Sequence, residues 1–332
     1  MSGPETTEPG SLSSGPMQRG AIGGVRSLSV VVPVYNSEAS LLPLVDRLEM
    51  ALSALGVPYE AVLVNDGSRD RSWEIISDLA GERSWISGIN LMRNYGQHNA
   101  LLCGIRSASH EVVVTMDDDL QNPPEEIGKL LAPLAQGFDV VYGPPLKERH
   151  GILRDAASRI TKLALQGAMG AETARNVSAF RVFRTQLRGA FEQYHGPYLS
   201  IDVLLTWSTT RFSAVRVRHD PRKIGVSNYT VKKLIVHALN MMTGFSTLPL
   251  QLGSVLGFAC TLFGFGVLVR VLIRYLLYGS AVPGFAFLAC IIAIFSGVQL
   301  FTLGIMGEYL ARIHFRMMER PTYAVRSTTR PK

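Results

Sequence analysis

Three adjacent carboxylates, Asp117, Asp118 and Asp119, follow an apolar run and precede the side-chain amide of Gln121. Like charges placed side by side repel one another, so their collection here indicates that they are held for a positively charged partner. Carboxylate and amide oxygens are hard ligands that suit Mg²⁺ or Mn²⁺ and leave positions open for phosphate oxygens. The cluster therefore predicts a divalent-metal site. A solvated turn that caps the helix starting at PPEE is the alternative.

The order of the three carboxylates predicts which side of the chain each one faces. In an extended segment alternate side chains face the same side, so Asp117 and Asp119 would point together, and Gln121 continues that parity. Asp118 would face the other side, toward a ribose or a base. We therefore expect Asp117, Asp119 and Gln121 to bind the metal and Asp118 to bind the nucleotide.

Two other polar segments follow predicted strands. Asp66 ends a β-branched run and would accept hydrogen bonds from the N–H groups of a base, while Gly67 permits close approach of a ligand. Gly96 opens a predicted helix whose N–H groups would face a diphosphate. Both segments are also common solutions for turns and helix caps, so neither is decisive alone.

Strands and helices alternate in the first half of the chain, which predicts an α/β fold with a mostly parallel sheet covered on both faces. Ligands of such sheets bind beyond the carboxyl ends of the strands, where the polar segments lie. One edge of the sheet is therefore expected to carry the site. The predicted strands cover 28–36, 59–66, 87–94 and 111–119, and the predicted helices cover 41–55, 70–79 and 96–107.

The second half is less regular and becomes apolar toward its end. Two stretches, most apolar at 248–269 and 284–307, are each long enough to cross a bilayer, with Arg270 and Arg274 beside the connecting loop. A buried hairpin of a soluble protein is the alternative. A basic amphipathic segment at 227–245 either lies in the membrane interface or packs as an ordinary helix. Further strands are predicted at 139–145, 177–183 and 212–220, and a helix at 153–170.

Basic residues set the expected orientation in the membrane. Lys232 and Lys233 precede the first apolar stretch, and Arg312, Arg316 and Arg320 follow the second. The positive-inside rule then places both ends of the chain in the cytoplasm. The expected organisation is a disordered tail at 1–26, a cytosolic catalytic domain at 27–226, an interface helix at 227–246, two transmembrane helices at 247–310 and a cytosolic arm at 311–332.

Composition narrows the function classes. The 332 residues carry a net charge of +7 and are 47% hydrophobic, which favours a membrane protein that binds anionic ligands. Most late basic residues flank apolar segments rather than alternate with aromatic ones, so nucleic acid is not an expected partner. The three cysteines have an odd count and no metal-ligand spacing, so no disulfide framework is expected.

Several motifs follow one another in a fixed order: VVPVYN, NDGS, RNYGQH, DDDLQNPPE, an R-x-x-G-x-S-x-Y element at 222–229, FSTLPL and GEYLARIHFRMMERPTY. This series resembles glycosyltransferase family 2, and within it the polyprenyl-phosphate glycosyltransferases, over residues 28–325. The resemblance implies an inverting type-A glycosyltransferase fold, Rossmann-like, with amphipathic interface helices and two C-terminal transmembrane helices.

The resemblance also implies roles for individual residues. Asp117, Asp119 and Gln121 would bind Mg²⁺ or Mn²⁺, and the two aspartates would act in catalysis with the arginines of the acceptor site. Relatives often read DAD, so Asp118 adds a carboxylate, and the sequence around Ser178 also departs from the usual form. The nucleotide would be held by Pro33, Tyr35, Glu38, Asp66, Gly96, Gln97 and Asp118, and the acceptor phosphate by Arg149, Arg154, Ser178, Arg181, Arg222, Ser227 and Tyr229.

The residues present favour a phosphate over a hydroxyl as the acceptor. A lipid phosphate, with a second pKa near ~6, is largely ionised at neutral pH and needs positioning by arginine rather than a general base. The region offers several arginines and only Asp202 as a base, which would also suit a helix cap. Together with this preference, the resemblance implies transfer from a nucleotide-diphosphate sugar, expected to be UDP-linked, to undecaprenyl phosphate at the cytoplasmic face of the cell membrane. The relatives also imply a homo-oligomer, a tetramer.

Other functions fit the sequence less well. A hydroxyl-directed membrane polysaccharide glycosyltransferase is expected to carry a QxxRW motif and more spans, which this sequence lacks. A non-catalytic membrane scaffold is expected to lose its metal ligands, yet Asp117, Asp119 and Gln121 all remain. A dinucleotide dehydrogenase is disfavoured because no GxGxxG follows the first predicted strand.

Overall fold

An eight-stranded sheet forms the centre of the N-terminal part. The computed structural model describes residues 24–146, 170–196, 199–221, 247–278 and 284–329. The strands lie in the order β7-β5-β6-β4-β1-β2-β3-β8 across the sheet. Their bounds are Leu28–Val34 (β1), Tyr59–Asn65 (β2), Ile86–Leu91 (β3), Val112–Thr115 (β4), Val140–Tyr142 (β5), Arg181–Arg184 (β6), Phe212–Ala214 (β7) and Val325–Thr328 (β8).

Most strands run in one direction, as the alternation of strands and helices predicts. β1 pairs in parallel with β2 and β4, β2 with β3, and β5 with β7. β6 lies antiparallel between β4 and β5, and β8 adds antiparallel to the outer edge of β3. The mostly parallel α/β sheet is therefore confirmed. The strand β6 overlaps the predicted strand at 177–183, whereas β8 and the antiparallel direction of both strands were not predicted.

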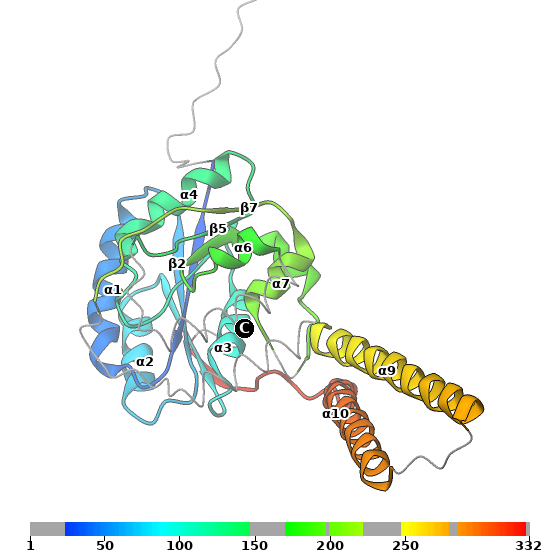
Figure 1. Cartoon of the computed structure of the whole chain (residues 1–332). Helices are drawn as coiled ribbons and strands as arrows, with labels where there is room; N and C mark the ends of the chain where they lie inside the picture. The colour runs from blue at the N-terminus through cyan, green and yellow to red at the C-terminus, as the bar shows by residue number, and fades with distance from the viewer. Residues whose placement is uncertain (1–23, 147–169, 197–198, 222–246, 279–283, 330–332) are drawn as a thin grey trace, which may run out of the picture.

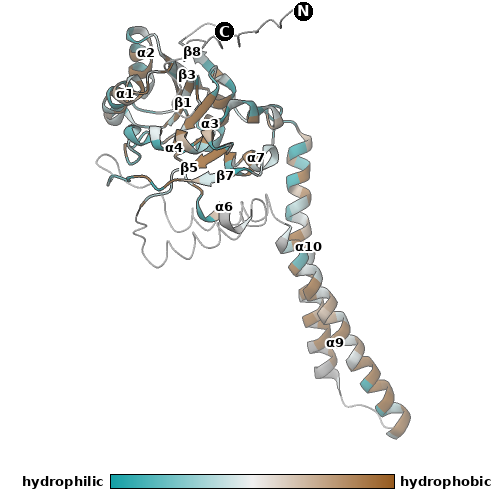
Figure 2. Cartoon of the chain, turned by 90° about the horizontal axis from the view of Figure 1, so that it is seen from above, coloured by the Kyte–Doolittle hydropathy of each residue, from teal (hydrophilic) through white to brown (hydrophobic). Residues whose placement is uncertain are grey.

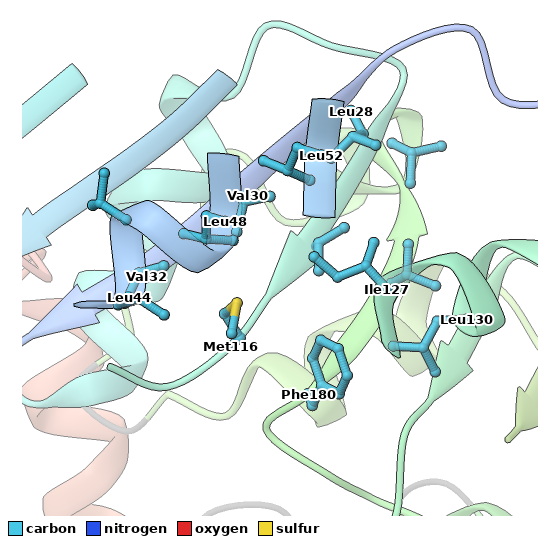
Figure 3. Close-up of a cluster of buried hydrophobic side chains, with 14 of the residues drawn as sticks. Leu28, Val30, Val32, Leu44, Leu48, Leu52, Met116, Ile127, Leu130 and Phe180 are labelled. Atoms are coloured by element: carbon cyan, nitrogen blue, oxygen red, sulfur yellow. The ribbon is translucent and has the colours of Figure 1, made fainter. Parts of the chain in front are cut away.

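Helices cover both faces of the sheet (Figure 1), with α1, α2 and α4 on one face and α3 and α7 on the other. A hydrophobic cluster lies on each face of the sheet, and alternate residues of β1 point to opposite faces. Val30 and Val32 belong to the first cluster, under α1, α2 and α4, and Val31 belongs to the second, under α3 and α7. Figure 3 shows Leu44 and Leu48 of α1 beside this strand in the first cluster. The helix bounds are Glu38–Ser53 (α1), Ser72–Glu82 (α2), Gln97–Ser107 (α3), Pro124–Glu126 (η1), Ile127–Ala135 (α4), Ala171–Arg175 (α6), Thr185–Ala190 (η2), Ile201–Ser208 (α7), Leu248–Tyr278 (α9) and Phe285–Met317 (α10).

The helices α9 and α10 project away from the sheet (Figure 2). Within them Pro249–Tyr278 and Ile294–Met317 have the length and hydropathy of membrane spans, and none of the apolar window of either is buried. The two predicted apolar helices are therefore present. Because α9 ends at Tyr278, Arg270 and Arg274 lie in its last turns, next to the residues that lead to α10, as predicted.

The segment after α10 returns to the sheet. The N–H of Met92 donates to the carbonyl of Ala324 at 2.9 Å, and the N–H of Gly88 donates to Thr329 Oγ1 at 2.9 Å. Tyr323 packs against the second hydrophobic cluster. These contacts tie the end of α10 to the strand that carries the β3–α3 loop.

Several predicted features lie outside the described residues. They are most of the predicted tail and of the helix at 153–170, the interface helix, and the acceptor-site candidates Arg149, Arg154, Arg222, Ser227 and Tyr229.

Candidate active site

The candidate site lies at the carboxyl ends of β1, β2, β3 and β4, where four loops meet. These strands are neighbours and pair in parallel, so the loops that follow them leave the sheet at the same edge. The predicted nucleotide and metal residues after these strands are thereby brought together.

The acidic cluster lies in a turn and not in the strand that precedes it. β4 ends at Thr115, and Leu120 has a φ of 60°, so the chain is not extended through the three carboxylates. The predicted strand to residue 119 is therefore wrong, and side-chain alternation along a strand cannot divide the carboxylates. Tertiary contacts divide them instead.

Each carboxylate of the cluster faces a different partner. Asp117 Oδ1 accepts a hydrogen bond from Gln97 Nε2 at 2.6 Å, and Asp119 Oδ1 accepts one from the N–H of Gln121 at 3.1 Å. Asp118 Oδ2 accepts one from Ser37 Oγ at 2.5 Å. Asp118 is thus separated from its neighbours, and it faces the loop between β1 and α1.

The environment of Asp118 opposes its charge. Burial raises the pKa of this carboxyl to about 6, and the negative charge of Asp119 adds to that effect. The hydroxyl of Ser37 and the N–H of Tyr35, 3.4 Å from Oδ2, lower the pKa in opposition. A carboxyl that is only partly stabilised by these contacts can still gain from a further hydrogen-bond donor, such as a ribose hydroxyl.

Asp66 fastens the β2–α2 loop to the β3–α3 loop. Its two carboxylate oxygens accept hydrogen bonds from the N–H groups of Tyr95 at 2.7 Å and Gly96 at 2.9 Å. Gly67, with a φ of 66°, lets the loops touch, because a Cβ atom there would lie 2.5 Å from backbone atoms of Arg93. Burial raises the pKa of Asp66, and the two N–H groups lower it in opposition.

The β3–α3 loop that Asp66 holds also contacts the acidic cluster. Gly96, with a φ of 93°, immediately precedes α3, and Gln97 is the first residue of that helix. The side chain of Gln97 reaches Asp117 from there. Asp66 therefore positions the loop whose amide contacts a predicted metal ligand.

Arg181 lies beneath the site in a buried ion pair. Its side chain is 1% exposed, its Nε donates to Thr115 Oγ1 at 2.9 Å, and its Nη1 donates to Asp202 Oδ1. Burial has the largest single effect and acts to lower the pKa of Arg181, but the charges of Asp202 and Tyr142 and the hydrogen bond to Asp202 together outweigh it and leave the pKa raised. Asp117 contributes in the same direction, which places the guanidinium within electrostatic reach of the acidic cluster.

The ion pair with Arg181 also indicates the role of Asp202. It is the second residue of α7, after the N-cap residue Ser200, and its carboxylate is engaged by Arg181. The hydroxyl of Tyr142 is buried nearby without a hydrogen-bond partner, and burial together with Asp202 raises the pKa of this phenol. The arrangement makes Asp202 a partner of arginine in this conformation rather than a free base.

The remaining described candidates lie on the rim or beneath it. Tyr35 is exposed after β1, and Pro33 is buried within that strand. Glu38 opens α1, and its carboxylate accepts a hydrogen bond from the N–H of Arg71 at 3.0 Å. Ser178 precedes β6, and its hydroxyl accepts one from the N–H of Phe180 at 3.2 Å.

Sequence reasoning missed two parts of the site. Ser37 was overlooked although it directly follows the VVPVYN motif, and that position was the available signal. The segment 215–221 lies along the acidic loop: the N–H of Asp220 donates to the carbonyl of Gln121 at 2.8 Å, and that of Arg218 to Glu126 Oε2 at 3.3 Å. No local pattern marks this contact, because its two sides are far apart in the chain.

The donor set fits a divalent cation that arrives with a phosphorylated ligand. Within the part of the chain that the structure describes, no three His, Cys, Asp or Glu side chains converge as a metal site. Mg²⁺ is commonly bound by one or two carboxylates together with substrate phosphates, so Asp117 and Asp119 are sufficient. Their oxygen ligands also suit Mn²⁺.

A mostly parallel sheet with an acidic cluster at the carboxyl ends of its strands is the arrangement of a type-A nucleotide-sugar glycosyltransferase. The sequence profile described as "Glycosyl transferase family 2" matches residues 29–194, half of the chain. The protein belongs to this family and is a glycosyltransferase.

Comparison with characterised proteins extends the similarity beyond the sheet. The chain is 34% identical over 304 residues to the undecaprenyl-phosphate 4-deoxy-4-formamido-L-arabinose transferase of Yersinia enterocolitica serotype O:8, covering 91% of this chain and 93% of the relative. The protein of the same description from Pectobacterium atrosepticum is 34% identical over 310 residues, covering 92% and 95%.

A solved structure supports the fold. Glucosyl-3-phosphoglycerate synthase from Mycobacterium tuberculosis, crystallised with Mn²⁺, UDP-glucose and phosphoglyceric acid, matches with a TM-score of 0.51 and 19% identity. The match covers 68% of this chain and 80% of the synthase. Identity at this level shows a shared fold and nothing more specific.

Proposed function

We propose that the protein transfers a sugar, with inversion, from a UDP-sugar to undecaprenyl phosphate at the cytoplasmic face of the cell membrane. The product would be a lipid-linked sugar donor for modification of the cell envelope. The observation that carries this proposal is the acidic cluster beyond the carboxyl ends of the parallel strands, where Gln97 engages Asp117 and Ser37 engages Asp118. The similarity to undecaprenyl-phosphate transferases over 91% and 92% of the chain supports the acceptor.

The donor would bind at the edge formed by the loops after β1 to β4. Tyr35, Glu38 and Asp66 would surround the base, with Pro33 beneath them, and Asp118 would accept a hydrogen bond from the ribose. Mg²⁺ or Mn²⁺ held by Asp117, Asp119 and Gln121 would neutralise charge on the leaving diphosphate. Gln97 holds Asp117 in place for that contact. Gly96 gives the backbone the turn that this arrangement needs.

The acceptor would be held by positive charge. A lipid phosphate is largely ionised at neutral pH, so it can attack without a base. This agrees with Asp202 being engaged by Arg181. Arg181 would act on the acceptor phosphate through its charge from beneath the site, because its side chain is buried. Direct contacts are proposed for Arg149, Arg154, Ser178, Arg222, Ser227 and Tyr229.

Incubation of the purified protein with a panel of nucleotide sugars, Mg²⁺ or Mn²⁺ and undecaprenyl phosphate tests the proposal. Mass spectrometry should detect a lipid-linked sugar with one donor, and NMR should show an inverted anomeric configuration. Failure to form product with any donor, together with no nucleotide binding, would refute it. A product formed only on a hydroxyl acceptor would replace it with polysaccharide synthesis. Native mass spectrometry of the same sample tests the proposed tetramer.

Asp119→Ala should reduce transfer by about a thousandfold, because each tenfold loss needs only ~1.4 kcal/mol of transition-state stabilisation and a metal supplies several. Asp78→Ala, an exposed aspartate on α2, is the matched control and should leave the rate unchanged. If Asp119→Ala retained full turnover, the assignment of the metal to this carboxylate would be wrong.

A further inference from the structure

Trp207 is a large apolar side chain on the surface of α7. It is 50% exposed, although its helix is otherwise buried at Val203, Leu204 and Leu205. The ring of Tyr194 packs edge-on against it, with 5.7 Å between the ring centroids and 62° between the planes. The two rings form an aromatic pair in which Trp207 faces outward and the half-buried Tyr194 connects it to the second hydrophobic cluster.

The end of a membrane-span helix contacts this pair. Arg316 lies in the last turn of α10, and its guanidinium carbon is 6.0 Å from the centroid of the Tyr194 ring. The candidate membrane span in α10, Ile294–Met317, ends one residue later, and its last turns carry the charged residues Glu308 and Arg312. Figures 1 and 2 both show α7 on the side of the sheet domain from which α9 and α10 project. The aromatic pair is therefore near the place where α10 leaves the bilayer.

The pair is held in this place by Arg106 of α3. Its Nη2 donates to the carbonyl of Tyr194 at 3.0 Å and to that of Glu192. The same guanidinium lies 5.7 Å from the ring of Tyr323, in the segment that follows α10. One arginine thus links the aromatic pair and the chain just beyond the span, so their relative position is fixed.

Position distinguishes Trp207 from other exposed apolar residues. Single exposed hydrophobic side chains are normal on protein surfaces, and Met50 on α1 is 66% exposed. Trp and Tyr, however, are enriched at membrane interfaces because they combine an apolar ring with a polar tip. Trp207 packs against Tyr194, whose ring contacts Arg316 in the last turn of α10, and this places the indole close to that zone. Arg316 beside the pair would favour anionic lipid headgroups.

We propose that Trp207 and Tyr194 insert into the headgroup zone of the membrane and fix the orientation of the sheet domain above it. This surface would hold α7, and with it Asp202 and Arg181, at a constant height over the bilayer. The inference rests on the membrane placement of α10 in the proposed function, but it does not depend on sugar transfer.

Tryptophan fluorescence of the full-length protein in lipid vesicles tests this surface. Trp73 and Trp85, which pack against the core of the sheet domain, are replaced by Phe so that Trp207 alone reports. Lipids brominated near the glycerol end of the acyl chain should abolish most of its emission, and lipids brominated near the chain terminus much less. Emission should also be blue-shifted relative to tryptophan in water.

Two variants make the result interpretable, each built with Trp207→Phe in the same background. Leu300→Trp, at a 71% exposed position in α10, should be quenched by the deeper label, and Met50→Trp by neither. If Leu300→Trp is quenched but Trp207 is not, the anchor is refuted while the span stands. If neither is quenched, the membrane placement itself fails. Blue-shifted emission of Trp207 without quenching means that protein covers it, which also refutes the anchor.

A second measurement avoids the risk that the Trp73 and Trp85 replacements unfold the protein. Vesicles with shallow-brominated lipid should quench a fraction of the wild-type emission, and Trp207→Phe should remove that fraction. An unchanged quenched fraction in Trp207→Phe would refute the proposal.

Discussion

The two halves of the sheet hold their buried carboxylates in opposite ways. In the first half, β1 to β4, Asp66 and Asp118 accept hydrogen bonds from neutral N–H and hydroxyl groups, and burial raises the pKa of both. In the second half, β5 to β7 with α7, Asp139 and Asp202 pair with arginines. The first half thus keeps negative charge that a ligand or cation can still stabilise, whereas the second half compensates its own charge and provides support.

The largest expected effect is on the support half. Arg181→Ala leaves Asp202 buried without its cation and should lower the free energy of unfolding by about 3–5 kcal/mol. The double variant Arg181→Met/Asp202→Leu should recover most of this loss, because it removes both charges. Denaturant unfolding in detergent, followed by fluorescence, measures both values.

The control for this pair has one exposed partner. Lys129 is 57% exposed and pairs with Glu126, which is 10% exposed, so Lys129→Ala should cost clearly less stability than Arg181→Ala because water reaches the ammonium side of the pair. If Arg181→Ala had an equally small effect, the buried pair would contribute little to the fold. The contrast between the halves would then rest on pKa directions alone.

The next effect is on the ligand half. Gln97→Ala removes the amide that orients Asp117 and should weaken Mn²⁺ affinity by about 10–100-fold, the range typical of groups that orient metal ligands. A titration of Mn²⁺ in the presence of UDP measures this affinity without turnover. A purely structural role would lower the amount of folded protein but leave the affinity of the folded fraction unchanged.

Gln136→Ala provides the matched control, because this exposed glutamine follows α4 and precedes β5, at the amino ends of the strands and so at the opposite edge of the sheet from the acidic cluster. Its Mn²⁺ affinity should equal that of the wild type. Equal affinity in Gln97→Ala as well would show that Asp117 does not need the amide.

The same contrast explains which parts of the structure could be predicted from sequence. The strands β1 to β4 and the helices α1 to α3 could be predicted because the spacing of their apolar residues is periodic within each element. The partners of Asp118 and Asp117 come from Ser37 and Gln97, which lie 81 and 20 residues away. Strand alternation separated Asp118 from its neighbours for the wrong reason, because the separation comes from these tertiary contacts and not from a strand.

The second half was harder to predict because its determinants are non-local. Arg181 opens a short strand whose sequence does not reveal that the guanidinium is buried, and its partner is on another element. β8 pairs with β3 across more than two hundred residues, and no residue pattern in either strand predicts this pairing. Motif resemblance identified the family, whereas only the fold showed that Asp202 is paired and that Trp207 lies beside α10.

The smallest effect concerns pH and has opposite signs in the two halves. Burial opposes the charge of Asp139, but hydrogen bonds from Thr209 and Arg211 outweigh it and leave the pKa lowered. Its contribution to stability is therefore present above the unfolded pKa of ~3.9 and lost as pH falls through the folded pKa. Asp66 has a raised pKa, so its contribution is full below ~3.9 and lost as pH rises through the folded pKa.

Thermal unfolding of Asp66→Asn and Asp139→Asn between about pH 2 and pH 8 tests this difference, with an expected amplitude on the order of 1 kcal/mol. Relative to the wild type, Asp66→Asn should become more stable as pH rises above ~4, whereas Asp139→Asn should become less stable as pH rises toward ~4 and change no further above it. The Asp66→Asn variant would also lose one acceptor for the N–H groups of Tyr95 and Gly96, but that loss is the same at every pH. The test therefore depends on how the stability difference from the wild type changes with pH, and not on its constant part. Parallel pH dependences for the two variants would remove the electrostatic distinction between the two halves of the sheet.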